Sequence, residues 1–186
     1  GEGTTSQGDF HEALNWASNA KAPVIFHIKD NEYAISTHRS EQTASSIYDM
    51  TSGYGNLSRY DVDGTDFFET SLAFKEAVQR ARRNKGPSII VSHVVRLLPH
   101  SSSDDQRKYR DEKSLNNDLK KDPLLILESK CVDAKFIKAD EFAKIRLQVD
   151  KDVDTDSAWA EEQDFPEPET AMDHIYSSKE YPEEST

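Results

Sequence analysis

The sequence contains a single cysteine, Cys131, among its 186 residues. An intrachain disulfide is therefore excluded, and the composition favours a reducing compartment. No stretch approaches the roughly 18–20 consecutive apolar residues of a membrane span, so we expect no membrane partner. The start at Gly1 lacks both an initiator Met and the apolar run of a signal peptide. We interpret it as an internal point of a longer protein, so that an upstream segment is expected.

Basic residues are also scarce. Lys and Arg number 23 against 35 Asp and Glu, for a net charge of -12, which argues against a nucleic-acid partner. Only two lysines accompany the many carboxylates of residues 150–186, the pattern of a solvated acidic segment. We expect a globular domain over residues 1–150, a helical extension over residues 151–176 and an acidic tail or linker over residues 177–186.

Short apolar runs alternate with helical spacing over the first part of the chain. Helices are indicated by apolar residues three and four positions apart, and strands by short β-branched runs. The spacing predicts helices over residues 6–21 and from Asp66 onward, and strands over residues 23–28, 58–62 and 88–98. This alternation favours an α/β fold in which a parallel sheet is flanked by helices.

Two smaller patterns refine this prediction. Asp66 and Glu69 have the spacing of a capping box at the start of a helix. Asp122 and Pro123 form an N-cap and first-turn pair before another apolar run. Trp16, in the first predicted helix, is expected in the core.

Gly1-Glu2-Gly3 immediately precedes the first predicted helix. In an open α/β sheet, ligands bind at the carboxyl ends of strands, next to the N-termini of helices. Glycines there let backbone N–H groups approach a phosphate, whose charge the helix N-terminus favours. Glu2 would repel a phosphate unless a cation lay between them, and Mg²⁺ accepts carboxylate and phosphate oxygens. Taken alone, this tripeptide is more typical of a tight turn.

Asn31 follows the second predicted strand and makes the pattern more specific. Its amide oxygen and the backbone carbonyl of Tyr33 are predicted to join Glu2 as the protein's ligands to Mg²⁺. Lys29 can face a diphosphate as a point charge. His38 and Arg39, further along, are candidates for the mouth of the pocket.

The joint pattern resembles the two-part thiamine-diphosphate motif, Gly-Asp-Gly followed after one helix and one strand by Asn-Asn. The chain departs from it because Glu2 replaces Asp and Asp30 replaces the first Asn, and Glu32 stands where Gly is common. Glu suits one branch of the family, whereas Asp30 adds charge near the metal. The resemblance implies that thiamine diphosphate and Mg²⁺ are held by Gly1, Glu2, Gly3, Thr4, Lys29, Asn31 and Tyr33.

A polar loop, residues 99–105, follows the last predicted strand. Its composition alone is that of a flexible, serine-rich surface loop. The wider sequence resembles the alpha subunit of the thiamine-diphosphate-dependent first component of 2-oxo acid dehydrogenase complexes, or the alpha region of a fused alpha-beta chain. The resemblance is carried by residues 1–33, 53–66 and 100–110. The branched-chain type is favoured over the pyruvate type by Gly1-Glu2-Gly3 and by residues 34–37 and 101–105.

This resemblance assigns roles to two residues of the loop. His100 is expected to reach the cofactor's phosphate and the reacting centre, where an imidazole can donate a hydrogen bond and move a proton. Ser101 occupies the family's regulatory phosphorylation position, where a phosphate would add about -1.5 to -2 charges. Pro99 stands where the branched-chain type usually has a second His, which leaves fine substrate choice open.

The implied reaction is oxidative decarboxylation of a 2-oxo acid, with transfer of the acyl group to a lipoyl arm. The implied partners are a beta subunit or fused beta region that holds the aminopyrimidine, and a lipoyl transacylase. We expect an α2β2 assembly or a dimer of fused chains, in the bacterial cytoplasm or the mitochondrial matrix. The present chain by itself is expected to be inactive.

Two alternatives stay open at this point. One is another type of thiamine-diphosphate enzyme, such as an acetoin dehydrogenase, a transketolase or an acetolactate synthase. The transketolase and acetolactate synthase types usually lack the His-Ser-rich-Asp-Asp loop. The other is a non-catalytic interaction module that retained the fold and lost the site. Binding of thiamine diphosphate with Mg²⁺ distinguishes the module from the enzymes.

Overall fold

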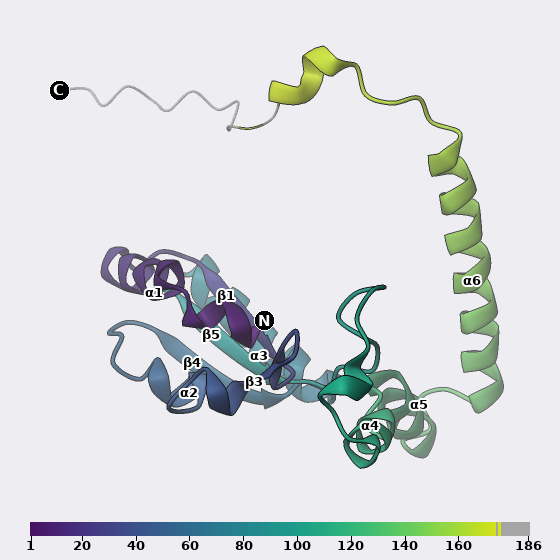
Figure 1. The fold of residues 1–186 in the computed structure, drawn as a ribbon, viewed down its shortest axis with the longest axis horizontal. Helices are drawn as coiled ribbons and strands as arrows, with labels where there is room; N and C mark the ends of the chain where they lie inside the picture. The colour runs from purple at the N-terminus through teal and green to yellow at the C-terminus, as the bar shows by residue number, and fades with distance from the viewer. Residues whose placement is uncertain (174, 176–186) are drawn as a thin grey trace. The chain divides into compact units, whose positions relative to one another are not determined.

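The computed structural model describes residues 1–173 and 175 (Figure 1). The chain divides into two compact units, Gly1–Ile137 and Lys138–Thr186. Within the described residues, no helix is both long enough and apolar enough to cross a membrane. The acidic tail predicted over residues 177–186 lies outside the described part.

A three-stranded parallel sheet forms the centre of the first unit. Its order is β1 (Ile25–Asp30), β5 (Ser88–His93) and β4 (Ser58–Asp63), with β5 in the middle. The register pairs the last residues of the three strands with one another, so that Asp30, His93 and Asp63 end at one edge. A two-stranded hairpin, β2 (Tyr33–Ala34) and β3 (Thr37–His38), follows β1 directly.

Helices precede, connect and follow these strands. In the first unit they are η1 (Glu2–Ser6), α1 (Gly8–Ala20), η2 (Arg39–Glu41), α2 (Ile47–Met50), α3 (Phe67–Arg82), η3 (Gln106–Lys108), α4 (Glu112–Leu119) and α5 (Pro123–Asp133). The second unit contains α6 (Ala139–Glu161) and η4 (Pro168–Met172).

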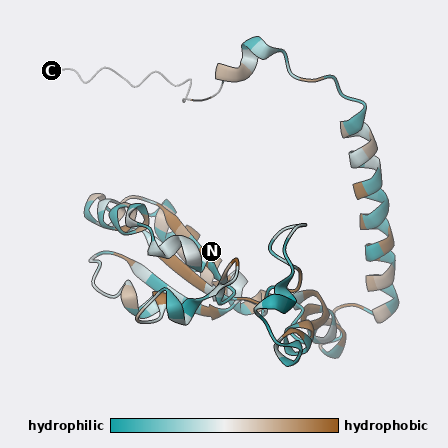
Figure 2. Cartoon of the chain, viewed as in Figure 1, coloured by the Kyte–Doolittle hydropathy of each residue, from teal (hydrophilic) through white to brown (hydrophobic). Residues whose placement is uncertain are grey.

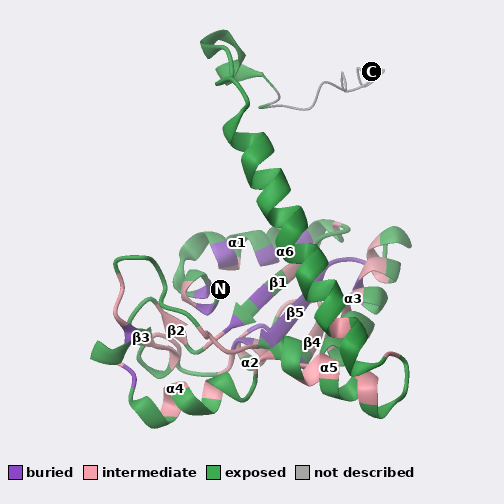
Figure 3. Ribbon diagram, turned by 90° about the vertical axis from the view of Figure 1, so that its right-hand side faces the viewer, coloured by how far each residue is buried: buried purple, intermediate pink, exposed green. Residues whose placement is uncertain are grey.

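Helices cover both faces of the sheet. Because alternate side chains of a strand point to opposite faces, β5 contributes to a separate apolar cluster on each. On one face, Ile89 and Val91 of β5 pack with Phe10 and Leu14 of α1. On the other, Ile90 packs against α3, in a cluster completed by Val62, Ala73 and Ala77. Figure 2 shows apolar residues concentrated on the strands, and Figure 3 shows burial concentrated in β5, the central strand, with further buried residues in α1 and β1. The predicted α/β fold, with a parallel sheet flanked by helices, is confirmed.

Two local predictions were wrong. Trp16 is 74% exposed, because it projects from another side of α1 than the buried residues of that helix, which are Phe10, Leu14, Ala17 and Ser18. The strand predicted over residues 88–98 ends at His93, where the neighbouring strands also end. The N–H of Val94 still bonds to the carbonyl of Asp30 at 2.9 Å, but the neighbouring strands do not extend alongside residues 95–98, so an apolar run alone cannot prolong the strand.

The second unit begins earlier than the expected boundary at residue 150. Its main helix, α6, runs unbroken from Ala139 to Glu161. Its start is fixed by Glu141, whose Oε2 accepts a 3.0 Å hydrogen bond from the backbone N–H of Lys138. The apolar spacing of Phe142, Ile145 and Val149 therefore belongs to one continuous helix rather than to the end of the globular domain.

The cap of α3 is close to the predicted one. The Oδ1 of Asp66 accepts hydrogen bonds from the N–H groups of Phe68 (2.9 Å) and Glu69 (3.4 Å). The Oε1 of Glu69 accepts a 3.0 Å hydrogen bond from the N–H of Asp63 and not from that of Asp66. The second hydrogen bond of the predicted capping box is therefore made to a residue before the N-cap. Lys130 of α5 forms an ion pair with the second oxygen of Asp66. The hydrogen bond from Lys130 is the main cause of a lowered pKa of Asp66.

We predict that Asp66→Ala lowers the free energy of unfolding by about 1 kcal/mol, because two helix N–H groups lose their acceptor. Asp66→Asn retains the cap and loses only the ion pair. Since folding lowers the pKa of Asp66, the contribution of its charge is present above the ordinary value of 3.8 and is lost as the pH falls through the folded pKa. Urea unfolding of the intact protein at pH 7 and pH 3 measures both effects, with the exposed Glu12→Ala as control. An Asp66→Ala protein as stable as the parent would contradict the cap.

Candidate functional site

The segment Gly1-Glu2-Gly3 lies against the end of β1 and the start of the hairpin. The carboxylate of Glu2 is buried, with the residue 3% exposed, and its Oε2 accepts a 3.1 Å hydrogen bond from the backbone N–H of Asn31. In turn the amide oxygen of Asn31 accepts a 3.1 Å bond from the N–H of Tyr33. The three residues predicted as metal ligands are therefore joined by direct hydrogen bonds.

The glycines allow this close approach. A Cβ on Gly3 would lie 2.5 Å from the Cβ of Ala34 in β2, closer than nonbonded carbon atoms approach in proteins. A Cβ on Gly1 would lie 3.4 Å from the carbonyl oxygen of Lys29. The first helical turn is held by Thr5, whose hydroxyl donates a 2.6 Å bond to the carbonyl of Glu2. Gly3 is thus required by packing against the hairpin.

The donor set fits a hard cation. Among the described residues, no hydrogen bond reaches the second oxygen of the buried Glu2, Oε1, while Oε2 is bonded to the backbone of Asn31. Oxygen atoms of this kind are the ligands that Mg²⁺ takes in proteins. No cluster of three or more His, Cys, Asp or Glu side chains placed to bind a metal occurs among the described residues. The predicted ligand set of Glu2, Asn31 and the Tyr33 carbonyl includes only one such side chain, so a search for clusters of three does not test it.

Asp30 and Glu32, the departures from the motif, have distinct environments. Asp30 is 1% exposed and forms an ion pair with Arg39, so its charge is matched within the protein. Arg39 therefore pairs with Asp30, and neither Arg39 nor His38 lines the two clefts described below. Glu32 has a φ of 68°, in the left-handed region that favours glycine. For a residue with a Cβ that conformation costs about 1–2 kcal/mol, which neighbouring contacts must offset.

The other predicted cofactor contacts are solvent-accessible. Lys29 is exposed next to the end of β1, and Thr4 is exposed in η1, where its N–H donates a 3.2 Å bond to the carbonyl of Gly1. His100 is exposed, and its backbone N–H donates a 2.9 Å bond to Asp104. The hydrogen bonds of the described residues do not join His100 to Glu2 or Asn31. The structure therefore brings together the predicted metal ligands Glu2, Asn31 and Tyr33, and holds His100 in a separate loop.

A hydrogen-bond network holds the loop that carries His100. Asp104 accepts bonds from the N–H of His100 and, at 2.6 Å, from the hydroxyl of Tyr109. The bond from Tyr109 is the main cause of the lowered pKa of Asp104. Burial raises the pKa of Tyr109, and its bond to Asp104 adds to the shift. The Tyr109 hydroxyl also accepts a 2.6 Å bond from Arg96, at the start of the loop.

This network contacts the loop of residues 31–33 through the ring of Tyr33. That loop carries two of the predicted metal ligands and is called the metal loop below. The guanidinium carbon of Arg110 lies 5.1 Å from the centre of the Tyr33 ring, and that of Arg96 lies 5.6 Å from it. The rings of Tyr33 and Tyr109 are 5.9 Å apart. Arg96 also donates a 2.8 Å bond to the carbonyl of Ile35 in the hairpin. The sequence reasoning missed these contacts, although Arg and Tyr at the two ends of a serine-rich loop were visible.

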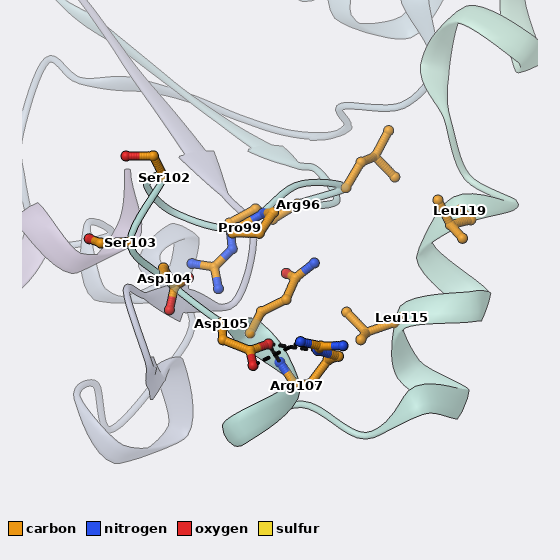
Figure 4. A pocket seen from close by; sticks show the side chains of 11 residues that line it. Arg96, Pro99, Ser102, Ser103, Asp104, Asp105, Arg107, Leu115 and Leu119 are labelled. Atoms are coloured by element: carbon orange, nitrogen blue, oxygen red, sulfur yellow. Dashed lines mark hydrogen bonds and ion pairs between the residues drawn. The ribbon is translucent and has the colours of Figure 1, made fainter.

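Two clefts border these loops. One, of about 600 Å³, lies between α4 and the serine-rich loop of residues 99–105, called the serine loop below. Its lining includes Arg96, Asp105, Arg107 and Leu115 (Figure 4). In Figure 4, Asp105 and Arg107 face each other across an ion pair with an N–O distance of 2.8 Å. The other, of about 480 Å³, opens where the three strands end, and its lining includes Asp30, Asn31, Asp63 and His93. This second position is where parallel sheets bind ligands.

The fold and these loops define an α/β protein with a pair of polar loops at the carboxyl edge of its sheet. A family model described as dehydrogenase E1 component matches residues 1–169. The chain belongs to this family, as the resemblance indicated.

Curated relatives refine the family assignment. The 2-oxoisovalerate dehydrogenase subunit alpha of Bacillus subtilis is 38% identical over 179 residues, which are 95% of this chain and 54% of the relative. The 3-methyl-2-oxobutanoate dehydrogenase subunit alpha of Mycobacterium tuberculosis is 39% identical over 67% of this chain and 34% of its own length. The pyruvate dehydrogenase E1 component subunit alpha of Staphylococcus aureus is 41% identical over the same shares. The chain thus spans about half the length of these relatives or less, and the relatives are named as alpha subunits.

We predict that Gly3→Ala disrupts the contact between η1 and the hairpin, because the added methyl group overlaps Ala34. Overpacking of this kind costs about 1–3 kcal/mol of unfolding free energy. The double variant Gly3→Ala, Ala34→Gly makes room and is expected to recover much of the loss. Gly8→Ala, where no atom lies within 4 Å of the added methyl, is the matched control. Denaturant unfolding measures all three, and a Gly3→Ala protein that unfolds like the Gly8→Ala protein would exclude the close packing.

Proposed function

We propose that this chain binds the diphosphate of thiamine diphosphate through Mg²⁺, as part of a 2-oxo acid dehydrogenase. The observation that carries the proposal is the buried Glu2 carboxylate, one oxygen of which accepts a hydrogen bond from the loop of Asn31 while the other accepts none from the residues that the structure describes. Membership of the dehydrogenase E1 component family supports thiamine diphosphate as the cofactor. In this site Glu2, Asn31 and the carbonyl of Tyr33 bind the cation, while Gly1, Gly3 and Thr4 line the diphosphate.

Two positively charged or protonatable groups complete the proposed site. Lys29 is exposed beside Gly1 and offers a point charge to a phosphate. His100 is exposed in the loop that the Asp104–Tyr109 hydrogen bond holds, where its imidazole donates a hydrogen bond or moves a proton. When bound, thiamine diphosphate supplies the carbanion chemistry of decarboxylation, and the protein supplies position and charge.

The proposed partners follow from the alpha-subunit relatives. A beta subunit, or a fused beta region, would hold the aminopyrimidine half of the cofactor in an α2β2 assembly or a dimer of fused chains. A lipoyl transacylase would accept the acyl group. The branched-chain substrate is favoured over pyruvate because the B. subtilis relative, named for 2-oxoisovalerate, aligns with 95% of this chain.

Ser101 is the proposed position of regulatory phosphorylation. Its side chain is exposed at the tip of the loop, and its hydroxyl lies 3.2 Å from that of Ser103. A phosphate there would add about -1.5 to -2 charges close to Asp104, whose carboxylate holds the N–H of His100. The expected result is a loosened loop. Mass spectrometry of the protein from its native source tests whether the site is used.

Binding of the cofactor provides the direct test. The intact protein with its beta subunit, titrated calorimetrically with thiamine diphosphate in the presence of Mg²⁺, is expected to bind. Asn31→Ala and Glu2→Gln each remove a ligand and are expected to weaken binding about 10- to 100-fold, the loss of one hydrogen-bonding group to a charge. Glu12→Gln, exposed on α1, is the matched control for Glu2→Gln. Absence of binding, or binding unaffected by Asn31→Ala, would contradict the proposal and favour an interaction module.

Activity tests the substrate and His100. We expect the intact enzyme to show a higher kcat/KM for branched-chain 2-oxo acids than for pyruvate. His100→Asn is expected to lower kcat about 100-fold or more, because a positioned acid or base contributes at least this much, with little change in Mg²⁺ affinity. His11→Asn is the control, since His11 lies on α1 and contacts Tyr54. Preference for pyruvate would reverse the substrate assignment, and full activity without His100 would remove its catalytic role.

A further inference from the structure

A buried carboxylate at the end of β1 has one principal counter-charge. The side chain of Asp30 is fully buried, and one of its oxygens, Oδ2, forms an ion pair with the guanidinium of Arg39 from η2. Within the described part of the chain, His93 is the other protonatable group within 4 Å of that oxygen: its Nδ1 lies 3.8 Å away, and its Nε2 is bonded to Asp61 at 2.6 Å. Removing one partner of such a pair leaves an uncompensated buried charge, which is strongly unfavourable.

The same two residues hold the backbone of the metal loop from both sides. The Oδ1 of Asp30 accepts a 3.0 Å hydrogen bond from the N–H of Glu32. The N–H of Arg39 donates a 2.7 Å bond to the carbonyl of Glu32. Both peptide groups of Glu32, whose φ is 68°, are therefore fixed by Asp30 and Arg39. A backbone in the region that favours glycine persists only where its surroundings hold it.

Each member of the pair is itself anchored. The carbonyl of Asp30 accepts a 2.9 Å bond from Val94, which follows β5. The carbonyl of Arg39 accepts bonds from the N–H groups of Gln42 (2.9 Å) and Thr43 (3.0 Å). The ion pair thus connects the sheet to the segment that follows the hairpin, and Asn31, Glu32 and Tyr33 lie between the two anchors.

We propose that the Asp30–Arg39 ion pair is a positioning device that forms the metal loop before the cation binds. It sets the conformation in which the Asn31 N–H meets Glu2 and the Asn31 amide oxygen meets the N–H of Tyr33. Asp30, which departs from the motif's Asn, is accommodated because Arg39 matches its charge. The inference rests on the proposed function, since it assigns the loop to Mg²⁺, and neither residue is a predicted ligand.

A charge-pair exchange in the intact protein tests the inference. Binding of Mn²⁺, in place of Mg²⁺, is followed in the presence of thiamine diphosphate by the paramagnetic resonance signal of the free ion. Arg39→Gln leaves Asp30 without its counter-charge and is expected to weaken Mn²⁺ binding at least about tenfold, as the loss of groups that orient ligands does. Asp30→Asn alone is expected to weaken it less, because the neutral amide oxygen can still accept the bond from Glu32.

The double variant, Asp30→Asn with Arg39→Gln, separates positioning by the pair from a general loss of structure. It removes both charges, keeps the amide-to-backbone bond, and is expected to bind Mn²⁺ within about threefold of the parent. Lys144→Gln, which breaks an exposed ion pair with Asp140 on α6, is the matched control and is expected to leave binding unchanged. Melting temperatures of the metal-free proteins, measured alongside, ensure that binding is compared where every variant is folded.

The outcomes are distinguishable. If the parent binds Mn²⁺ and thiamine diphosphate while Arg39→Gln binds equally well and only melts earlier, the pair serves stability and the positioning role is wrong. If the double variant binds no better than Arg39→Gln, charge matching is not the cause, and the inference also fails. If the parent itself binds neither, the proposed function fails, and the assignment of this loop to a metal fails with it.

Discussion

Parallel pairing of β5 with β1 and β4 is the constraint on which the site depends. It aligns the last residues of the three strands, so that the loops after β1 and β5 leave from one edge of the sheet. The apolar residues of β5 stabilise this arrangement from both faces, with Ile89 and Val91 against α1 and Ile90 against α3. Polar loops at that edge therefore rest on a rigid, buried base.

Two kinds of contact shape the loops at the edge of the sheet. Close packing at Gly3 and the hydrogen bond between Glu2 and Asn31 bring η1 onto the loop after β1. Buried charges shape the loop itself, through Asp30 and Arg39. The first kind positions the oxygen atoms of the proposed cation site. The second holds the backbone of Glu32, whose φ is 68°, between Asp30 and Arg39. A departure from the motif at Asp30 is thus compensated locally, by a residue nine positions away.

The serine loop is held by contacts between cationic and aromatic side chains rather than by a buried ion pair. Arg96, Tyr109 and Arg110 surround the ring of Tyr33, so that the loop after β5 contacts the loop after β1 through an aromatic side chain between cations. Tyr33 therefore serves both loops, with its backbone in the metal loop and its ring in the contact between them. This dual use gives an exposed, polar segment a defined attachment, although the His100 side chain itself faces solvent.

Sequence by itself determined the α/β class and the pairing of Gly1-Glu2-Gly3 with Asn31, because periodicity reports which faces are buried and motif spacing reports which strand ends meet. It also indicated the helix starts at Asp66 and Asp122, which depend on neighbouring residues alone. Only the tertiary structure decided that Trp16 is exposed, that β5 stops at His93, and that Arg39 binds Asp30. These features depend on which surfaces and charges other elements bring close, and no local pattern in the chain records that.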